Sequence, residues 1–87
     1  MTKLEEKLIQ LGYKSYYTSL NLEHQRYYKQ FSNVIGINIT IKYGKITISN
    51  IEYVKHLFYN QQDIDNLQLA YNQLQSDLEE LKQVDNE

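Results

Sequence analysis

The stretch VIGINITIKYGKITISN, residues 34–50, decides the fold because it contains two strand patterns separated by a short turn. Isoleucines recur at every second residue from Ile35 to Ile41 and again at Ile46 and Ile48, the period of a half-buried strand. A two-residue turn at Tyr43-Gly44 predicts three opposed pairs: Ile41 with Ile46, Thr40 with Thr47, and Ile39 with Ile48. Like residues meet on both faces, so the sequence predicts an antiparallel hairpin in this register.

The neighbouring segments extend this sheet. Residues 13–19 are rich in Tyr and predict a strand, and residues 25–32 predict another, with Tyr27, Lys29 and Phe31 on one face. Residues 51–59 fit either a last strand or a short helical turn, because apolar side chains occur on both alternating sets; the strand is favoured. Together these segments predict an antiparallel meander of about four strands within residues 13–59.

Helices are predicted at both ends of the chain. Residues 1–12 form a short helix, with Thr2 as its cap, Leu4, Leu8 and Leu11 on one face, and Gly12 as its stop. Residues 61–84, capped by Asn60, form a long amphipathic helix across one sheet face. The chain is therefore predicted to be a single α+β domain, residues 1–87.

The long helix carries an apolar seam with successive spacings of 3, 4, 3, 4 and 3 residues: Ile64, Leu67, Tyr71, Leu74, Leu78 and Leu81. Its length of about 36 Å exceeds the ~17–20 Å of a short strand, so we expect part of it to overhang the sheet. One interpretation packs its N-terminal half on the sheet and leaves Leu74, Leu78 and Leu81, with Leu69 on the opposite side, for a second copy or another protein. The alternative packs the whole seam on the chain's own sheet.

Charge is distributed unevenly along the chain. Residues 1–59 have a net charge of +4 and residues 60–87 a net charge of −6, within an overall −2. A solvated acidic helix on a mildly basic body explains this pattern, and so does a charged recognition surface. If the basic, Tyr-rich sheet binds an anion or a nucleic acid, the candidate contacts are Arg26, Tyr28, Lys42, Tyr43 and Lys45.

Motifs for catalysis are missing from the sequence. The histidines His24 and His56 lie on different predicted elements, there is no Cys, and no HExxH, G-x-S-x-G or P-loop pattern occurs. We therefore expect no enzyme activity, no metal site and no cofactor. The opening residues, MTKLEEKLIQLG, lack the apolar run of a signal peptide or membrane span, so we expect a cytoplasmic protein with no membrane contact.

The stretch YNQQDIDNLQLAYNQLQSDLEELK, residues 59–82, resembles the C-terminal helix of small uncharacterised proteins from phages and prophages of low-GC Gram-positive (staphylococcal-type) bacteria. Residues 4–8 and 11–13 resemble the LEEKL…LGY opening of the same proteins, and QDIDNLQ, residues 62–68, is the most specific part. The resemblance covers about 35 residues at the two ends of the chain. It implies an accessory role in the host cytoplasm through binding of a host or defence component, and it carries over no functional residue.

We therefore expect a non-catalytic protein that acts by protein–protein contact, through self-association, a host protein, or both. The alternative is a nucleic-acid or nucleotide-binding module that uses the basic sheet.

Overall fold

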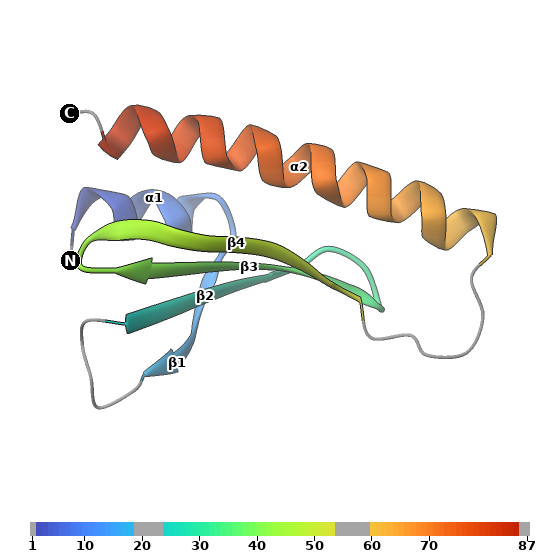
Figure 1. Cartoon of the computed structure of the whole chain (residues 1–87), viewed down its shortest axis with the longest axis horizontal. Helices are drawn as coiled ribbons and strands as arrows, with labels where there is room; N and C mark the ends of the chain where they lie inside the picture. The colour runs from blue at the N-terminus through green and yellow to red at the C-terminus, as the bar shows by residue number, and fades with distance from the viewer. Residues whose placement is uncertain (1, 19–23, 54–59, 86–87) are drawn as a thin grey trace.

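The computed structural model of the chain describes residues 2–18, 24–53 and 60–85 and confirms the predicted α+β fold. In chain order the elements are helix α1 (Lys3–Gln10), strands β1 (Lys14–Thr18), β2 (His24–Gln30), β3 (Ile35–Lys42) and β4 (Lys45–Tyr53), and helix α2 (Gln61–Asp85). The strands form one antiparallel sheet in the order β1-β2-β3-β4. Both helices lie on the same side of it, which leaves a helix-free face among the described residues (Figure 1).

Both helices begin at the predicted caps. The Thr2 hydroxyl accepts a hydrogen bond from the Glu5 amide at 3.2 Å, and the Asn60 side chain accepts one from the Asp63 amide at 2.8 Å. Helix α1 ends before Gly12, whose φ of +100° lets the chain reverse into β1. These local signals fix where each helix starts and how α1 meets the sheet.

The tip of the predicted hairpin is confirmed. Lys42 pairs with Lys45 and Ile41 with Ile46, so the turn holds two residues. Tyr43 and Gly44 have φ values of +54° and +77°, as a two-residue turn with both central residues in the left-handed region requires.

Beyond the tip, the predicted register is wrong. Thr40 pairs with Ile48 and Ile39 with Ser49, because Thr47 is an extra residue in β4 that forms a β-bulge. Without the bulge, the helix-covered side of β4 would present Asn50 and Glu52. With it, Ile51 and Tyr53 lie on that side and Glu52 does not, so burial of apolar area favours the irregular pairing over the perfect alternation.

The ambiguous segment 51–59 is resolved in part. Ile51, Glu52 and Tyr53 continue β4, opposite Ile37, Gly36 and Ile35 respectively. Residues 54–59 lie outside the described residues.

The core lies between the helices and the sheet. It is built from apolar side chains of α1, the sheet and the C-terminal half of α2: Leu4, Leu8, Tyr13, Tyr27, Ile37, Ile39, Ile41, Leu74 and Leu81. Leu74 is 4% exposed and Leu81 is fully buried, so the expectation that these two residues remain free for a partner is wrong.

The end of α2 that overhangs is also the reverse of the one expected. In Figure 1 the first turns of α2 extend past the ends of the strands, whereas the last turns lie over α1 and the sheet. The exposed large apolar side chains of α2 also lie toward the overhanging end. Ile64, Leu69 and Tyr71 are each about half exposed, at 49%, 55% and 52%. All three lie in the N-terminal half of the helix.

Candidate protein-binding surface

A buried polar cluster fixes the rotation of α2 about its own axis. Asp77 is 1% exposed and accepts hydrogen bonds from the Tyr13 hydroxyl at 2.8 Å, the Lys29 ammonium at 2.6 Å and the Gln73 amide at 2.9 Å. Lys29 also donates to the Leu11 carbonyl at 3.0 Å, and its ammonium lies 4.6 Å from the centre of the Tyr13 ring. The cluster therefore joins the α1–β1 turn, β2 and α2 at one point.

The electrostatics of the cluster favour a neutral tyrosine. Burial, followed by the hydrogen bond to Asp77 and the negative charge of that carboxylate, raises the pKa of Tyr13 well above its ordinary value near 10. Among the described residues, no buried side-chain nitrogen or oxygen lacks a hydrogen-bond partner. Asp77 is thus accommodated in the core as a fully paired carboxylate.

The rotation set by Asp77 explains why the predicted seam is only partly correct. The side of α2 that faces the core is centred on Ala70, Leu74, Asp77 and Leu81, with Asp63 buried near the start of the helix. At 100° per residue, Ile64 and Tyr71 lie about a quarter turn away from that centre. An apolar pattern could not place the core face correctly, because one of its central positions is occupied by an aspartate.

The displaced part of the seam forms an apolar flank along α2, which we define as Ile64, Leu67, Tyr71 and Leu78. Ile64 and Tyr71 are about half exposed, and Leu67 and Leu78 are half-buried. The positions between them on the same side, Gln68 and Gln75, are uncharged. A helix with an acidic net charge thus presents an uncharged flank, and depletion of charge is the compositional mark of an interface centre.

The opposite flank of α2 is already in use. It lies beside α1, where the Lys7 ammonium and the Glu80 carboxylate approach to 3.9 Å. Leu69, which the sequence placed among the partner contacts, lies toward this side and not on the apolar flank. The apolar flank faces β4 instead, because Leu78 meets Ile46 across a small cavity.

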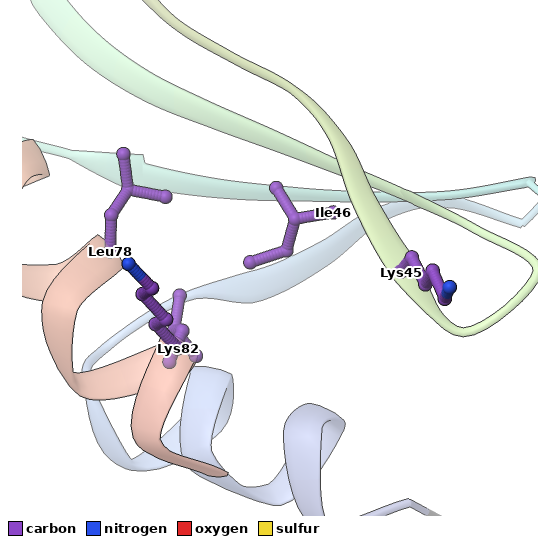
Figure 2. A pocket seen from close by; sticks show the side chains of 5 residues that line it. Lys45, Ile46, Leu78 and Lys82 are labelled. Carbon is purple, nitrogen blue, oxygen red and sulfur yellow. The ribbon is translucent and has the colours of Figure 1, made fainter. Parts of the chain in front are cut away.

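That cavity has a volume of about 330 Å³ and is lined by Lys45, Ile46, Leu78, Leu81 and Lys82. Figure 2 shows Leu78 and Lys82 on α2 opposite Ile46 on β4, with Lys45 nearer the turn. Three of the five lining residues, Ile46, Leu78 and Leu81, are apolar, and β4, which contributes Ile46, is the last strand of the sheet.

Strand β4 has a free edge, because it is the last strand of the sheet and no described strand pairs with its outer side. A free edge presents unpaired backbone N–H and C=O groups to solvent, and these groups can form hydrogen bonds with a strand from another chain. The Thr47 bulge interrupts that edge near the turn and leaves Ile48–Tyr53 as its regular part. The apolar flank of α2 and the free edge of β4 therefore lie on the same side of the protein.

The predicted anion contacts are placed around the helix-free face. By strand pairing, Arg26, Tyr28 and Lys42 share that face, and Lys45 lies opposite Lys42 at the turn. Tyr43 is exposed at the turn, and the Lys42 ammonium lies 5.5 Å from the centre of its ring. Arg26, Tyr28 and Lys42 thus share the helix-free face, whereas Lys45 also lines the cavity between β4 and α2, so the five residues do not form a single site.

Tyr28 has a packing role on the helix-free face. Its ring covers Gly36, where an added Cβ would lie 2.3 Å from a ring carbon, and its hydroxyl donates to the Gln30 side chain on the same strand at 2.6 Å. The glycine therefore provides the space that the ring occupies, and one ring face is already in contact with the protein.

Within the described residues, no group of three or more His, Cys, Asp or Glu side chains is arranged to hold a metal ion. His56 lies outside those residues. Across the same residues, no helix combines the length and the apolar character needed to cross a membrane.

No protein family, curated protein or solved structure gives a significant match to this chain.

Sequence reasoning missed the Asp77 cluster, although a signal for it was present. Lys29 alternates with Tyr27 on a strand face that is otherwise apolar, and Asp77 falls in line with Ala70, Leu74 and Leu81 on the helix. Opposite charges on two core-facing patterns predict a buried ion pair. When each residue is considered alone, Lys29 and Asp77 are both predicted to be solvent-exposed.

Proposed function

We propose that this chain is a non-catalytic protein that acts by binding another polypeptide. The observation that carries the proposal is the uncharged, partly exposed apolar flank of α2 beside the free edge of β4. Such an edge supplies backbone hydrogen bonds to an added strand, and an adjacent apolar surface supplies affinity and selectivity. The same side of the protein offers both.

We further propose that the binding takes place in the cytoplasm of a bacterial host as a phage or prophage accessory function. The resemblance of residues 59–82 to phage and prophage proteins of low-GC Gram-positive bacteria supports this origin. The partner on this proposal is either a second copy or a host or defence protein.

The experiment is capture from a low-GC Gram-positive lysate with the tagged full chain, followed by mass spectrometry. Tyr71→Lys places a charge in the centre of the apolar flank, whereas the matched control Ser76→Lys places the same charge on the exposed side of α2. We expect Ser76→Lys to keep the wild-type partners and Tyr71→Lys to lose them. Equal capture by both variants would show that the flank is not the binding surface.

A second candidate function is anion or nucleic-acid binding by the helix-free face. It is favoured by one observation, the placement of Arg26, Tyr28 and Lys42 on the same face, with Lys45 at its border. Binding of duplex DNA would weaken with salt at a log–log slope of about −0.9 for each phosphate contact. Titration of labelled oligonucleotides at 50 and 200 mM salt, with Lys42→Glu/Lys45→Glu as the disrupted variant, tests this function separately.

A further inference from the structure

We propose that the occupant of this surface is a second copy of the chain, related by a two-fold axis that passes between the two β4 edges and between the two α2 flanks. The proposal rests on the proposed function and names its partner. The two sheets would join into one eight-stranded antiparallel sheet, with the two α2 helices side by side above the junction. Three features of the described residues are consistent with one such axis.

The first feature is the self-complementary spacing of the apolar flank. Ile64, Tyr71 and Leu78 are seven residues apart, so they form a row along one side of α2. When two such rows run antiparallel about Tyr71, Ile64 of each copy meets Leu78 of the other, and the two Tyr71 rings meet at the axis. A two-fold interface requires this kind of reciprocal match.

The second feature is the position of this axis along β4. The cavity sets Leu78 and Leu81 beside Ile46, and Figure 1 shows α2 running antiparallel to β4. Tyr71 is seven residues before Leu78 and ten before Leu81, or about 10–15 Å along the helix. At ~3.3 Å per strand residue, that is three to five residues beyond Ile46, or four to six with the extra residue at the bulge, and both ranges include Asn50.

The third feature is the register that an axis at Asn50 produces. Asn50 then faces its own copy, Ser49 faces Ile51, and Ile48 faces Glu52, so each pair lies on a common sheet face. The regular part of β4, Ile48–Tyr53, is almost centred on this axis, and the Thr47 bulge lies at its border. The axis that the helix places near Asn50 is therefore compatible with pairing of the two β4 edges.

The size of the surface is consistent with a weak dimer. The six residues of Ile48–Tyr53 give a length of about 20 Å, and a helix layered ~10 Å above a sheet gives a height of about 20 Å. The two dimensions together offer on the order of 400 Å² on each copy, which is below the ~800 Å² per partner typical of stable interfaces and in the range of weak ones. We therefore expect a weak dimer that forms at high micromolar concentrations.

The first test is light scattering on the full chain at ~100 μM, where weak self-association is still detectable. The wild type and Ser76→Lys should give twice the chain mass of 10.4 kDa, and folded Tyr71→Lys should give the mass of one chain. A wild-type monomer at this concentration would overturn the proposal. So would a Tyr71→Lys variant that remains a dimer.

Cysteine crosslinking locates the axis without a destabilising charge, and the natural chain contains no cysteine to interfere. Residues that face their own copy across an antiparallel pair have Cα atoms ~4.5–5.5 Å apart, which suits a disulfide. Asn50→Cys should form an intermolecular disulfide under mild oxidation, and Ser76→Cys should not. Equal crosslinking of the two variants would place the contact elsewhere and overturn the proposal.

The results separate this inference from the proposed function. A wild-type monomer whose lysate partner is lost only in Tyr71→Lys would overturn the dimer and retain the binding function. If the wild type is a dimer, Tyr71→Lys is a monomer and no protein is captured from the lysate, the results would support the dimer and exclude a host protein as the partner.

Discussion

Replacement of Asp77 tests whether paired charges in the core hold α2 in its orientation. Asp77→Leu is a substitution of similar size that leaves the Lys29 ammonium, whose side chain is 16% exposed, without its carboxylate. Breaking a buried ion pair from one side costs about 3–5 kcal/mol. A chain of this length has a total stability of roughly 4–13 kcal/mol, so the single variant should be strongly destabilised or unfolded.

Removal of both charges should recover most of that loss. Lys29→Met/Asp77→Leu removes both charges of the pair, and exchanging a whole buried pair for apolar residues is often neutral or stabilising. The Tyr13 hydroxyl then lacks its acceptor at a cost of about 1–3 kcal/mol, which Tyr13→Phe should relieve. We therefore expect a coupling free energy between residues 29 and 77 of at least ~2 kcal/mol.

The measurement is urea unfolding followed by circular dichroism for the wild type, both single variants, the double variant and the triple variant. If Asp77→Leu does not fold, Asp77→Asn replaces it as a less destabilising variant, because the amide retains an acceptor oxygen for Tyr13. If the double variant loses as much stability as the two singles together, to within ~0.5 kcal/mol, the charges act independently and the reasoning is refuted.

Three further predictions concern local features. Because the pKa of Tyr13 is raised in the folded state, the unfolded chain releases that proton first, so stability should fall as pH rises above about 10; in urea titrations between pH 9 and 11, Tyr13→Phe should remove up to ~1.4 kcal/mol of this loss per pH unit. Gly36→Ala should lower the melting temperature because its methyl group overlaps the Tyr28 ring, and the loss should shrink when Tyr28→Ala is already present. Gly44→Val should cost about 1–3 kcal/mol from backbone strain alone, since a Cβ there meets nothing within 4 Å; an unchanged unfolding midpoint would contradict the left-handed turn.

The features that the sequence predicts correctly are those with local causes. Thr2 and Asn60 cap the two helices, and Tyr43-Gly44 makes the turn, because each depends on hydrogen bonds or dihedral angles within a few residues. The alternating isoleucines of β3 likewise place Ile35, Ile37, Ile39 and Ile41 in the core. The α+β fold follows from these signals.

The features that the sequence misplaces depend on distant partners. The register of β4 depends on which of its residues lie under α2. The bulged register covers Ile51 and leaves Glu52 on the other face, and this preference depends on a helix that is distant in the sequence. The rotation of α2 depends on Lys29 and Tyr13, which are 48 and 64 residues from Asp77. The exposed flank at Ile64 and Tyr71 follows from that rotation, so the candidate binding surface could not be located from the helix pattern alone.

The bulge at Thr47 also determines how β4 tolerates changes in length. Since Thr47 has no partner in β3, its deletion would leave Ile46 opposite Ile41 and Ile48 opposite Thr40. Deletion of one residue between Ile48 and Tyr53 would instead move every later side chain of the strand to the opposite face of the sheet. Single-residue length differences among related chains should therefore be tolerated at position 47 and be rare in the rest of the strand.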